Sequence, residues 1–212
     1  MWYRIPKRAI DITGSLVLAV LFFPLCVGTI IAIKADSDGP ILADTPKRVG
    51  RGGKLFKLYK FRSMMVNAHT LLRTNPKFKK LYEEYKRNSY KLKDDPRVTH
   101  IGRFIRKHSL DEIPQLVNVL RGEMSLVGPR PYYEDELAEQ QRKHPHTRPL
   151  VAEVLSAKPG ITGYWQVSGR SEVDFVKRIR LDAEYVRRRS LYLDILILLK
   201  SPWAMISGKG AV

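Results

Sequence analysis

The sequence has little cysteine and little acid, and it lacks the glycine-rich motifs that bind nucleotide phosphates. Only one cysteine, Cys26, occurs in 212 residues, so a disulfide framework is excluded and a reducing, cytoplasmic setting is indicated. Neither G-x-x-x-x-G-K-[S/T] nor G-x-G-x-x-G is present, so side chains and short loops would have to bind any phosphate. The length suits one domain with a substantial core.

The shortage of acid leaves the chain strongly positive. There are 38 Lys and Arg against 21 Asp and Glu, a formal net charge of +17. Such a charge predicts anionic partners: nucleic acid, a phospholipid surface or phosphorylated small molecules. Tyr and Phe side chains among the lysines of residues 54–91 could stack on bases, so a nucleic-acid-binding protein is the main alternative from another class. The uncharged run and the acidic pair described next do not fit that alternative, and we predict no nucleic-acid partner.

Residues 12–33 form an uncharged run, ITGSLVLAVLFFPLCVGTIIAI, that is long enough to cross a hydrocarbon core. Pro24 lies near its middle, where it removes a helical hydrogen bond and forces a kink or a break. Basic residues flank both ends, and the positive-inside rule would keep both flanks cytoplasmic. A re-entrant hairpin broken at Pro24 satisfies both observations, and a straight span with a proline kink is the alternative. We therefore divide the chain into a membrane hairpin at 1–36 and a cytoplasmic catalytic domain at 37–212.

The rest of the chain predicts an α/β fold with more helix than strand. Residues 34–54 are typical of a loop or short hairpin, and KLFKLYKFRSM at 54–64 predicts a strand with its cations on the solvent side. A glycine-punctuated loop is expected at 158–171. We expect helices at 66–91, in the basic segment 94–112, at 134–155, and as a pair after residue 171. The amphipathic and apolar helices among them are expected to lie on a membrane surface.

Asp111 and Glu112 form an adjacent acidic pair within SLDEIPQLVNVLRGEMSLVGPRP, residues 109–131. Ser109 and Glu112 match a capping box, so a simple helix cap is one explanation of the pair. Pro114 complicates it, because a proline lacks the N–H that such a helix would need there and favours a helix that starts beside it. The pair would then lie at a helix junction, where an electropositive N-terminus lowers the pKa of a carboxyl. Such a carboxylate stays ionised, as a nucleophile or a metal ligand must.

Arg130 lies between two prolines in VGPRP, which fix the backbone and leave the side chain little entropy to lose. A rigid arginine near carboxylates can form a salt bridge or, alternatively, a bidentate clamp on phosphate. Lys60, Arg106 and Arg170 could join it, although each by itself is typical of a solvated cation.

In this order, these segments resemble the bacterial sugar transferases, the monotopic polyprenyl-phosphate phosphoglycosyl transferases. The resemblance is carried by KRAIDITGS and FFP, YKFRSM, LKDDPRVTHIGRFIRKHSLDEIPQLVNVLRGEMSLVGPRP, KPGITGYWQVSGRS, LDAEYV and the ending GKGAV. LKDDPRVT and the ending are most similar to enzymes that initiate exopolysaccharide or O-antigen synthesis with a hexose-1-phosphate. In many of those this domain follows a membrane bundle, so either a minimal enzyme or an excised catalytic part is expected.

The resemblance implies a two-step transfer at the cytoplasmic face of the bacterial inner membrane. A carboxylate attacks the β-phosphorus of a UDP-sugar and releases UMP, and polyprenyl (undecaprenyl) phosphate then takes up the phosphosugar. By this resemblance Asp111 is the nucleophile, and Glu112 holds Mg²⁺ together with Asp111. The family also has a hairpin broken at proline, which favours the re-entrant interpretation of Pro24. The substrate-binding positions that it implies are Lys60, Arg106, Arg130, Gln166, Arg170 and Asp182.

Two departures from the family pattern leave specific roles open. Members usually have a Gln shortly before the R-x-G turn, where this chain has Asp44, Thr45 and Pro46. Many also have a small residue before the helix-breaking proline, where this chain has Phe23. The sequence does not choose among galactose, glucose and an N-acetylated sugar, and it leaves a homodimer open. A non-catalytic membrane scaffold of the same fold is the remaining alternative.

Overall fold

The structure, a computed structural model, describes residues 3–88, 90, 92, 94–168 and 174–206, with side chains up to residue 202. It is helix-rich with two small sheets, so the predicted excess of helix over strand is confirmed. The helices are α1 (Arg4–Leu21), α2 (Phe23–Asp36), α3 (Ala68–Thr74), α4 (Lys79–Arg87), α5 (His100–Lys107), α6 (Gln115–Leu120), α7 (Glu134–Lys143), α8 (Arg148–Val154), α9 (Tyr164–Val167), α10 (Phe175–Arg188) and α11 (Leu191–Ile206). The antiparallel pair is β1 (Arg48–Val49) with β2 (Leu55–Phe56), and the parallel pair is β3 (Ser125–Val127) with β4 (Gly160–Thr162).

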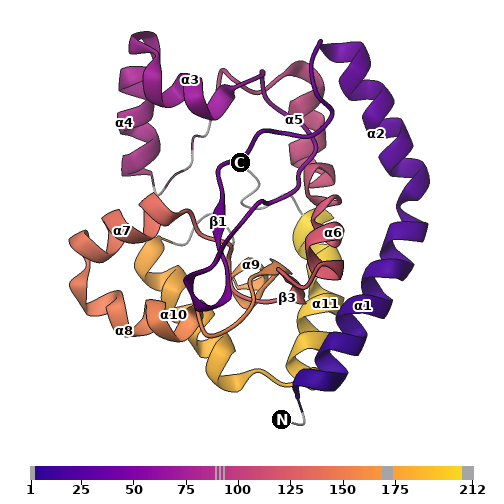
Figure 1. Ribbon diagram of the computed structural model, residues 1–212, viewed down its shortest axis with the longest axis vertical. Coiled ribbons are helices and arrows are strands. Elements are labelled where there is room, and N and C mark those ends of the chain that lie inside the picture. The colour runs from indigo at the N-terminus through magenta and orange to yellow at the C-terminus, as the bar shows by residue number, and fades with distance from the viewer. Residues whose placement is uncertain (1–2, 89, 91, 93, 169–173, 207–212) are drawn as a thin grey trace.

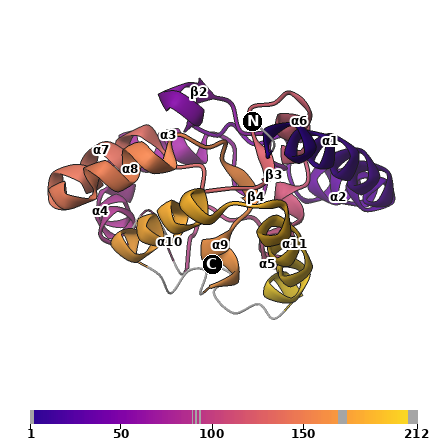
Figure 2. The same ribbon diagram turned by 90° about the horizontal axis from the view of Figure 1, so that it is seen from below.

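The helices fall into two groups on either side of the parallel pair (Figures 1 and 2). On one side lie α1 and α2 with α5, α6 and α11, and on the other lie α3, α4, α7 and α8. The first group contains the most apolar segments of the chain, α1, α2 and α11. The molecule therefore has one apolar flank and one polar flank.

The N-terminal run is broken where the sequence predicts a break. α1 ends at Leu21 and α2 begins at Phe23, with Pro24 in the first turn of α2, and the two helices are bent by 60°. A proline is tolerated in a first turn because the N–H groups there have no helical acceptor. Within the described residues no single helix has the length and hydropathy of a membrane span, whereas α1 and α2 together have both.

Helix α1 is fastened to the body of the protein through buried polar side chains. Asp11 Oδ1 accepts hydrogen bonds from Ser125 Oγ at 2.9 Å and from the Leu126 N–H at 3.0 Å, both in β3. The Lys7 ammonium lies 3.4 Å from Asp11 and 3.1 Å from Asp194 of α11. Buried charges are stable only when they are paired in this way, so α1 is fixed in position relative to β3 and α11.

Helix α2 packs on α5 through an apolar cluster. Ile33, Phe61 and Ile105 form its buried centre. Leu110 and Ile113 pack against that centre, and they flank the acidic pair on both sides. The N-terminal hairpin and the segment that carries Asp111 and Glu112 therefore share one hydrophobic cluster.

The segment 54–64 differs from the predicted strand. Only Leu55–Phe56 pairs as a strand, and the rest makes isolated bridges. The expected exposure of its cations is also wrong for Arg62, which is buried and donates to the carbonyl oxygens of Asp38 and Ser37, each at 2.7 Å. The physical reason is that these carbonyls follow the end of α2 and need donors, which Arg62 supplies.

The glycine-punctuated segment also has more regular structure than expected, since it forms β4 and α9. In the parallel pair Ser125 lies opposite Gly160 and Val127 opposite Thr162. A Cβ atom on Gly160 would lie 2.1 Å from the Gly128 nitrogen, so the backbones can approach only because this position has no side chain.

Replacing the buried carboxylate of α1 should destabilise the fold. Asp11→Ala leaves Lys7, the Ser125 hydroxyl and the Leu126 N–H without their shared acceptor, and we expect a loss of about 3 kcal/mol in the free energy of unfolding. Thermal unfolding in detergent measures this as a lower Tm. Thr13→Ala, at an exposed position of the same helix, is the matched control and should leave the Tm nearly unchanged. Equal Tm values for the two variants would contradict the inference that these contacts fix α1 in position.

Candidate active site

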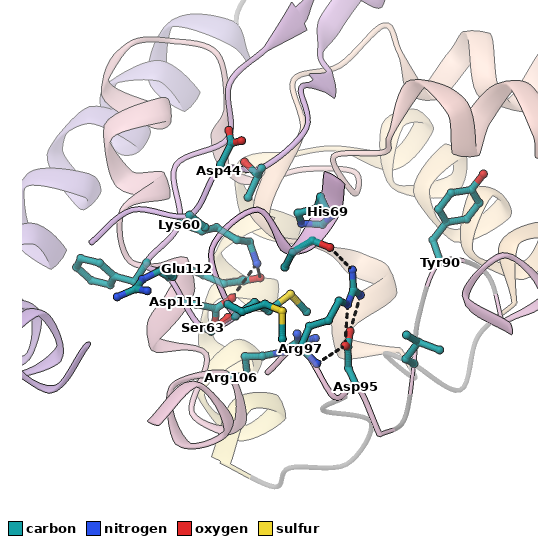
Figure 3. A pocket seen from close by; sticks show the side chains of 18 of the residues that line it. Asp44, Lys60, Ser63, His69, Tyr90, Asp95, Arg97, Arg106, Asp111 and Glu112 are labelled. Atoms are coloured by element: carbon teal, nitrogen blue, oxygen red, sulfur yellow. Dashed lines mark hydrogen bonds and ion pairs between the residues drawn. The ribbon is translucent and has the colours of Figure 1, made fainter. Parts of the chain in front are cut away.

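One cavity, of about 320 Å³, collects most of the predicted site residues (Figure 3). Its walls come from the segment before β1 and the segment after β2, from α3, α5 and α9, and from the turn before α6. The predicted residues that line it are Lys60, Arg106, Asp111, Glu112, Arg130 and Gln166. Two others do not appear in this lining: Asp182 lies behind it, and Arg170 lies outside the described residues.

The acidic pair lies at a junction between two helices. The 3₁₀ turn Leu110–Glu112 connects α5 to α6, and α6 begins directly after Pro114. The junction inferred from Pro114 is therefore confirmed. The capping-box alternative is wrong, because Ser109 has a left-handed backbone (φ 56°) and its side chain caps no N–H. The turn leaves Asp111 only 8% exposed at the cavity wall.

Lys60 links the two carboxylates. Its ammonium nitrogen lies 3.0 Å from Asp111 Oδ2 and 2.9 Å from Glu112 Oε1, as the dashed lines in Figure 3 show. The next residue holds this arrangement in place, because the Phe61 N–H donates to the Asp111 carbonyl oxygen at 3.0 Å. Backbone and side-chain contacts together fix the distance between Lys60 and the acidic pair.

The electrostatic balance at Asp111 differs from the sequence-based expectation. Burial raises the pKa of the Asp111 carboxyl above its ordinary value, the Lys60 ammonium opposes this, and Glu112 adds to it. The prediction that the helix junction lowers this pKa is therefore wrong, because desolvation outweighs the favourable field. The two carboxylates in turn raise the pKa of Lys60 despite its burial, so the ammonium stays charged. Cations in the cavity thus favour the ionised form of Asp111.

The acidic pair fits a divalent cation that is completed by substrate. Asp111 Oδ2 and Glu112 Oε1 converge on one positively charged nitrogen, so both oxygens can share a single cation. Mg²⁺ prefers one or two carboxylates together with phosphate oxygens over an all-protein cage. Across the described residues no group of three or more His, Cys, Asp or Glu side chains could hold a metal ion. A magnesium ion here would therefore need oxygen ligands from a bound diphosphate or from water.

Two arginines add positive charge to the cavity wall. The Arg106 guanidinium favours the ionised forms of both Asp95 and Asp111, and at Asp111 it opposes the rise in pKa that burial causes. The Arg130 guanidinium lies 5.4 Å from the centre of the Trp165 ring, a cation–π contact. Burial opposes the charge of Arg130, but Glu136 together with Tyr132, Tyr133 and Tyr85 outweighs it, so the pKa of the guanidinium is raised. Arg130 therefore stays positive despite its burial, and both guanidinium groups can attract phosphate.

Asp182 has a different position from the one the resemblance implies. It is 0% exposed, and its Oδ2 accepts hydrogen bonds from the Arg130 N–H at 3.2 Å and from the Tyr132 hydroxyl at 2.8 Å. Burial raises the pKa of this carboxyl to about 7. We interpret Asp182 as a positioning residue, since it holds the backbone of Arg130 and lies behind that residue.

The cavity also includes residues that the sequence reasoning missed. Arg97 forms a two-point ion pair with Asp95, at 2.8 and 2.6 Å. The Asp-Pro-Arg sequence could have suggested this pair, because a proline turn brings its neighbours together. Arg48, His69 and Tyr133 also line the cavity, but they come from separate segments and no spacing in the sequence connects them.

Asp182→Asn should weaken the pH dependence of stability. Between the ordinary carboxyl pKa of 3.8 and about 7, the folded chain binds a proton that the unfolded chain does not. This carboxyl therefore makes the fold less stable as the pH rises through that window. The neighbouring Arg130 and Tyr132 have raised pKa values and titrate above this window, and Asn keeps an acceptor oxygen for its two donors. Tm values measured from about pH 5 to 8 should fall less in the variant than in the parent chain. Glu83→Gln, at an exposed position, should keep the parental slope, and the same slope in Asp182→Asn would refute the assignment.

Comparison with known proteins places these residues in a family. The family described as Bacterial sugar transferase matches residues 2–208. A UDP-galactose-lipid carrier transferase of Erwinia amylovora is 45% identical over 212 residues, which cover 98% of this chain and 42% of that protein. The exopolysaccharide production protein ExoY of Rhizobium meliloti is 41% identical over 209 residues, 97% of this chain and 87% of ExoY. An undecaprenyl-phosphate glucose phosphotransferase of Komagataeibacter xylinus is 42% identical over 202 residues, 93% of this chain and 35% of that protein.

The chain thus spans less than half of the Erwinia and Komagataeibacter proteins and most of ExoY. The match to the family covers the hairpin, the acidic pair and the wall of the cavity. The chain belongs to the bacterial sugar transferase family.

Proposed function

We propose that this chain transfers a hexose-1-phosphate from a UDP-sugar to polyprenyl (undecaprenyl) phosphate and releases UMP. The reaction would be the first membrane step in the synthesis of an exopolysaccharide, capsule or O-antigen. The observation that carries the proposal is the buried Asp111, which lies at the wall of a cavity lined by Lys60, Arg106 and Arg130. The names of the relatives support the same reaction class. They include a UDP-galactose-lipid carrier transferase and an undecaprenyl-phosphate glucose phosphotransferase.

In the first step an Asp111 carboxylate oxygen attacks the β-phosphorus of the UDP-sugar. A bond forms between that oxygen and phosphorus, and the bond from the β-phosphorus to the bridging oxygen breaks. UMP leaves with the electron pair, and a phosphosugar-aspartate remains. An anion can approach a diphosphate only when positive charge offsets their repulsion, which Arg106, Arg130 and Lys60 would provide. Mg²⁺ bound by Asp111 and Glu112 would further neutralise the diphosphate.

In the second step an oxygen of polyprenyl phosphate attacks the phosphosugar phosphorus. The bond from that phosphorus to the Asp111 oxygen breaks, the polyprenyl-diphosphate sugar leaves, and the free carboxylate is restored. The same carboxylate is first nucleophile and then leaving group, so it needs surroundings that tolerate both its free and its esterified form. Partial burial together with Lys60 at 3.0 Å meets that need, since burial favours the uncharged ester and the ammonium favours the free anion.

The lipid substrate requires the cavity to lie near a bilayer, and the apolar flank supports this. Val20 is 77% exposed, Phe23 64% and Leu199 72%. Large exposed apolar side chains gathered on one flank are typical of a protein or membrane contact surface. Further exposed apolar side chains on the same flank are Leu16, Val17, Leu21, Ile31, Phe104 and Ile195. We infer that α1 and α2 form a re-entrant hairpin and that α5 and α11 lie in the interface at the cytoplasmic face of the inner membrane. Because α2 packs beside Leu110 and Ile113, a lipid phosphate at that surface would meet Asp111.

The nucleophile assignment predicts that Asp111→Asn abolishes the first step. Wild-type protein, a UDP-sugar, polyprenyl phosphate and Mg²⁺ should release UMP, and mass spectrometry without the lipid should detect the phosphosugar on the peptide that contains Asp111. The amide is a far weaker nucleophile, so UMP release should fall by at least about 10³-fold. A panel of UDP-galactose, UDP-glucose and UDP-N-acetylated sugars would identify the donor.

Glu83→Gln, at an exposed position of α4, is the matched control and should keep full activity. UMP release that survives in Asp111→Asn would refute the role of this residue. A wild-type protein that binds vesicles but releases no UMP from any sugar of the panel would favour the non-catalytic scaffold.

The re-entrant topology predicts that both ends of the hairpin face the cytoplasm. In a Cys26→Ser background, single cysteines at the exposed positions Arg4 and Ala35 should react with an impermeant maleimide from the cytoplasmic side only. A cysteine at Val20, near the break, should be protected by lipid and become reactive in detergent. Labelling of Arg4→Cys and Ala35→Cys from opposite sides would instead demonstrate a true membrane span.

A further inference from the structure

We propose that the end of the cavity away from Asp111, around Arg48, His69 and Tyr133, binds the uracil base of the nucleotide substrate. The inference rests on the proposed function and extends it, because it assigns a binding role to residues that neither the sequence motifs nor the relatives' names identify. Three independent observations support it: the direction of the reaction, the lining of this end of the cavity, and the charge state of its polar groups.

The direction of the reaction decides where the nucleoside lies. In phosphoryl transfer the attacking and leaving oxygens are roughly in line on opposite sides of phosphorus. With Asp111 as the attacking group, the UMP leaving group must extend from the β-phosphorus away from Asp111, while the sugar lies to the side. The base is then expected along the cavity, at the end farthest from the acidic pair.

The end of the cavity away from Asp111 is lined by aromatic side chains. Figure 3 shows His69 on the side of the cavity away from Asp111 and Glu112, and Tyr90 farther away still. Tyr85 and Tyr133 also line this end, with Tyr85 and Tyr90 edge-to-face at 5.2 Å. Aromatic walls bind planar bases by stacking, whereas phosphate gains nothing from them.

The positive charges at this end are largely occupied by protein groups. Arg97 pairs with Asp95 through two contacts and donates to the Ala68 carbonyl oxygen at 2.9 Å. The Arg48 guanidinium stacks on Tyr133 at 3.2 Å from the ring centre and donates to a backbone carbonyl oxygen. Phosphate would therefore have to compete with Asp95 and with backbone carbonyl oxygens for these cations.

One donor at this end is nevertheless left for a ligand. The Nε–H of Arg48 is buried and has no hydrogen-bond partner, and Arg48 lines the cavity with only 7% of its surface exposed. A buried donor without an acceptor is costly, so an uncharged ligand oxygen would satisfy it. The O2 and O4 atoms of uracil are acceptors of this kind.

His69 supplies a neutral group that can both donate and accept. Burial together with the charges of Arg48 and Arg97 lowers the pKa of its imidazole to about 4, so the ring is uncharged at neutral pH. A neutral imidazole has one N–H donor and one acceptor nitrogen. Uracil presents adjacent acceptor and donor groups, O4 and N3–H, whereas cytosine presents an amino donor and a ring acceptor in the same places. Because the two ring nitrogens diverge, His69 can bond one of these two uracil groups, and it does so without adding charge.

The test is the affinity of His69→Ala for UDP, measured by isothermal titration calorimetry on the full chain in detergent without lipid substrate. Loss of the hydrogen bonds to the base should weaken UDP binding about tenfold and reduce the preference for UDP over CDP. His146→Ala, at an exposed position outside the cavity, is the matched control and should bind UDP as the wild type does. His69→Gln keeps a neutral donor and acceptor and should recover part of the UDP affinity. Its Tm also shows whether the fold tolerates a smaller change at this position.

Several results would overturn the proposal. Unchanged UDP affinity in His69→Ala, with the Tm of the wild type, would show that the base binds elsewhere. Unchanged UDP affinity together with weaker UDP-sugar binding would place the hexose at this end. If both His69 variants fail to fold, the wild-type chain is modified with diethyl pyrocarbonate instead. UMP should protect His69 from modification and ribose 5-phosphate should not; equal modification of His69 with and without UMP would refute the proposal. Sugar-phosphate transfer by the wild type is assayed separately, so the proposed function can stand when this inference fails.

Discussion

Two adjacent carboxylates, one buried and one half-buried, can line this cavity because one ammonium lies between them. Lys60 contacts Asp111 and Glu112 at 3.0 and 2.9 Å, and without it the pair would repel each other and lose the solvation of water. The neighbouring structure holds this contact in place: the Phe61 N–H binds the Asp111 carbonyl oxygen, and Leu110 and Ile113 pack into the cluster centred on Ile33 and Ile105. The surplus of positive charge in the chain therefore has a local use, since it lets an acidic site exist inside the fold.

Residues behind the cavity wall hold the arginines of the cavity in position. Arg130 reaches the cavity from a backbone whose N–H is held by Asp182, and Glu136 keeps its guanidinium charged. Asp95 holds Arg97 in a similar way. The cavity thus places Lys60 and Arg106 beside the acidic pair and aromatic side chains around His69, an arrangement that suits the proposed ligand, with phosphates at one end and an uncharged ring at the other.

Local sequence rules predicted where helices end and begin, whereas burial and long-range pairing depended on three-dimensional packing. Pro24 and Pro114 act within one helical turn, so the sequence alone located the break between α1 and α2 and the start of α6. The direction of the Asp111 pKa shift depends on how deeply the turn is buried, which no local rule contains. The predicted strand at 54–64 failed for the same reason, because Arg62 was needed as a donor for carbonyls contributed by a distant segment. Arg48, His69 and Tyr133 meet only through the fold, and no motif could have connected them.

The buried contacts that hold α1 on β3 bear on how deeply the proposed hairpin would enter a membrane. Asp11 and Lys7 hold α1 on the catalytic body, so under the proposed function the hairpin cannot tilt or slide without breaking buried ion pairs. The length of α1, about 27 Å for its 18 residues, would then set how far the acidic pair stands from the lipid hydrocarbon. A bilayer of different thickness would have to deform around the protein. The length of α1 would thus set the depth in the membrane at which the phosphate of a lipid carrier meets the carboxylate of Asp111.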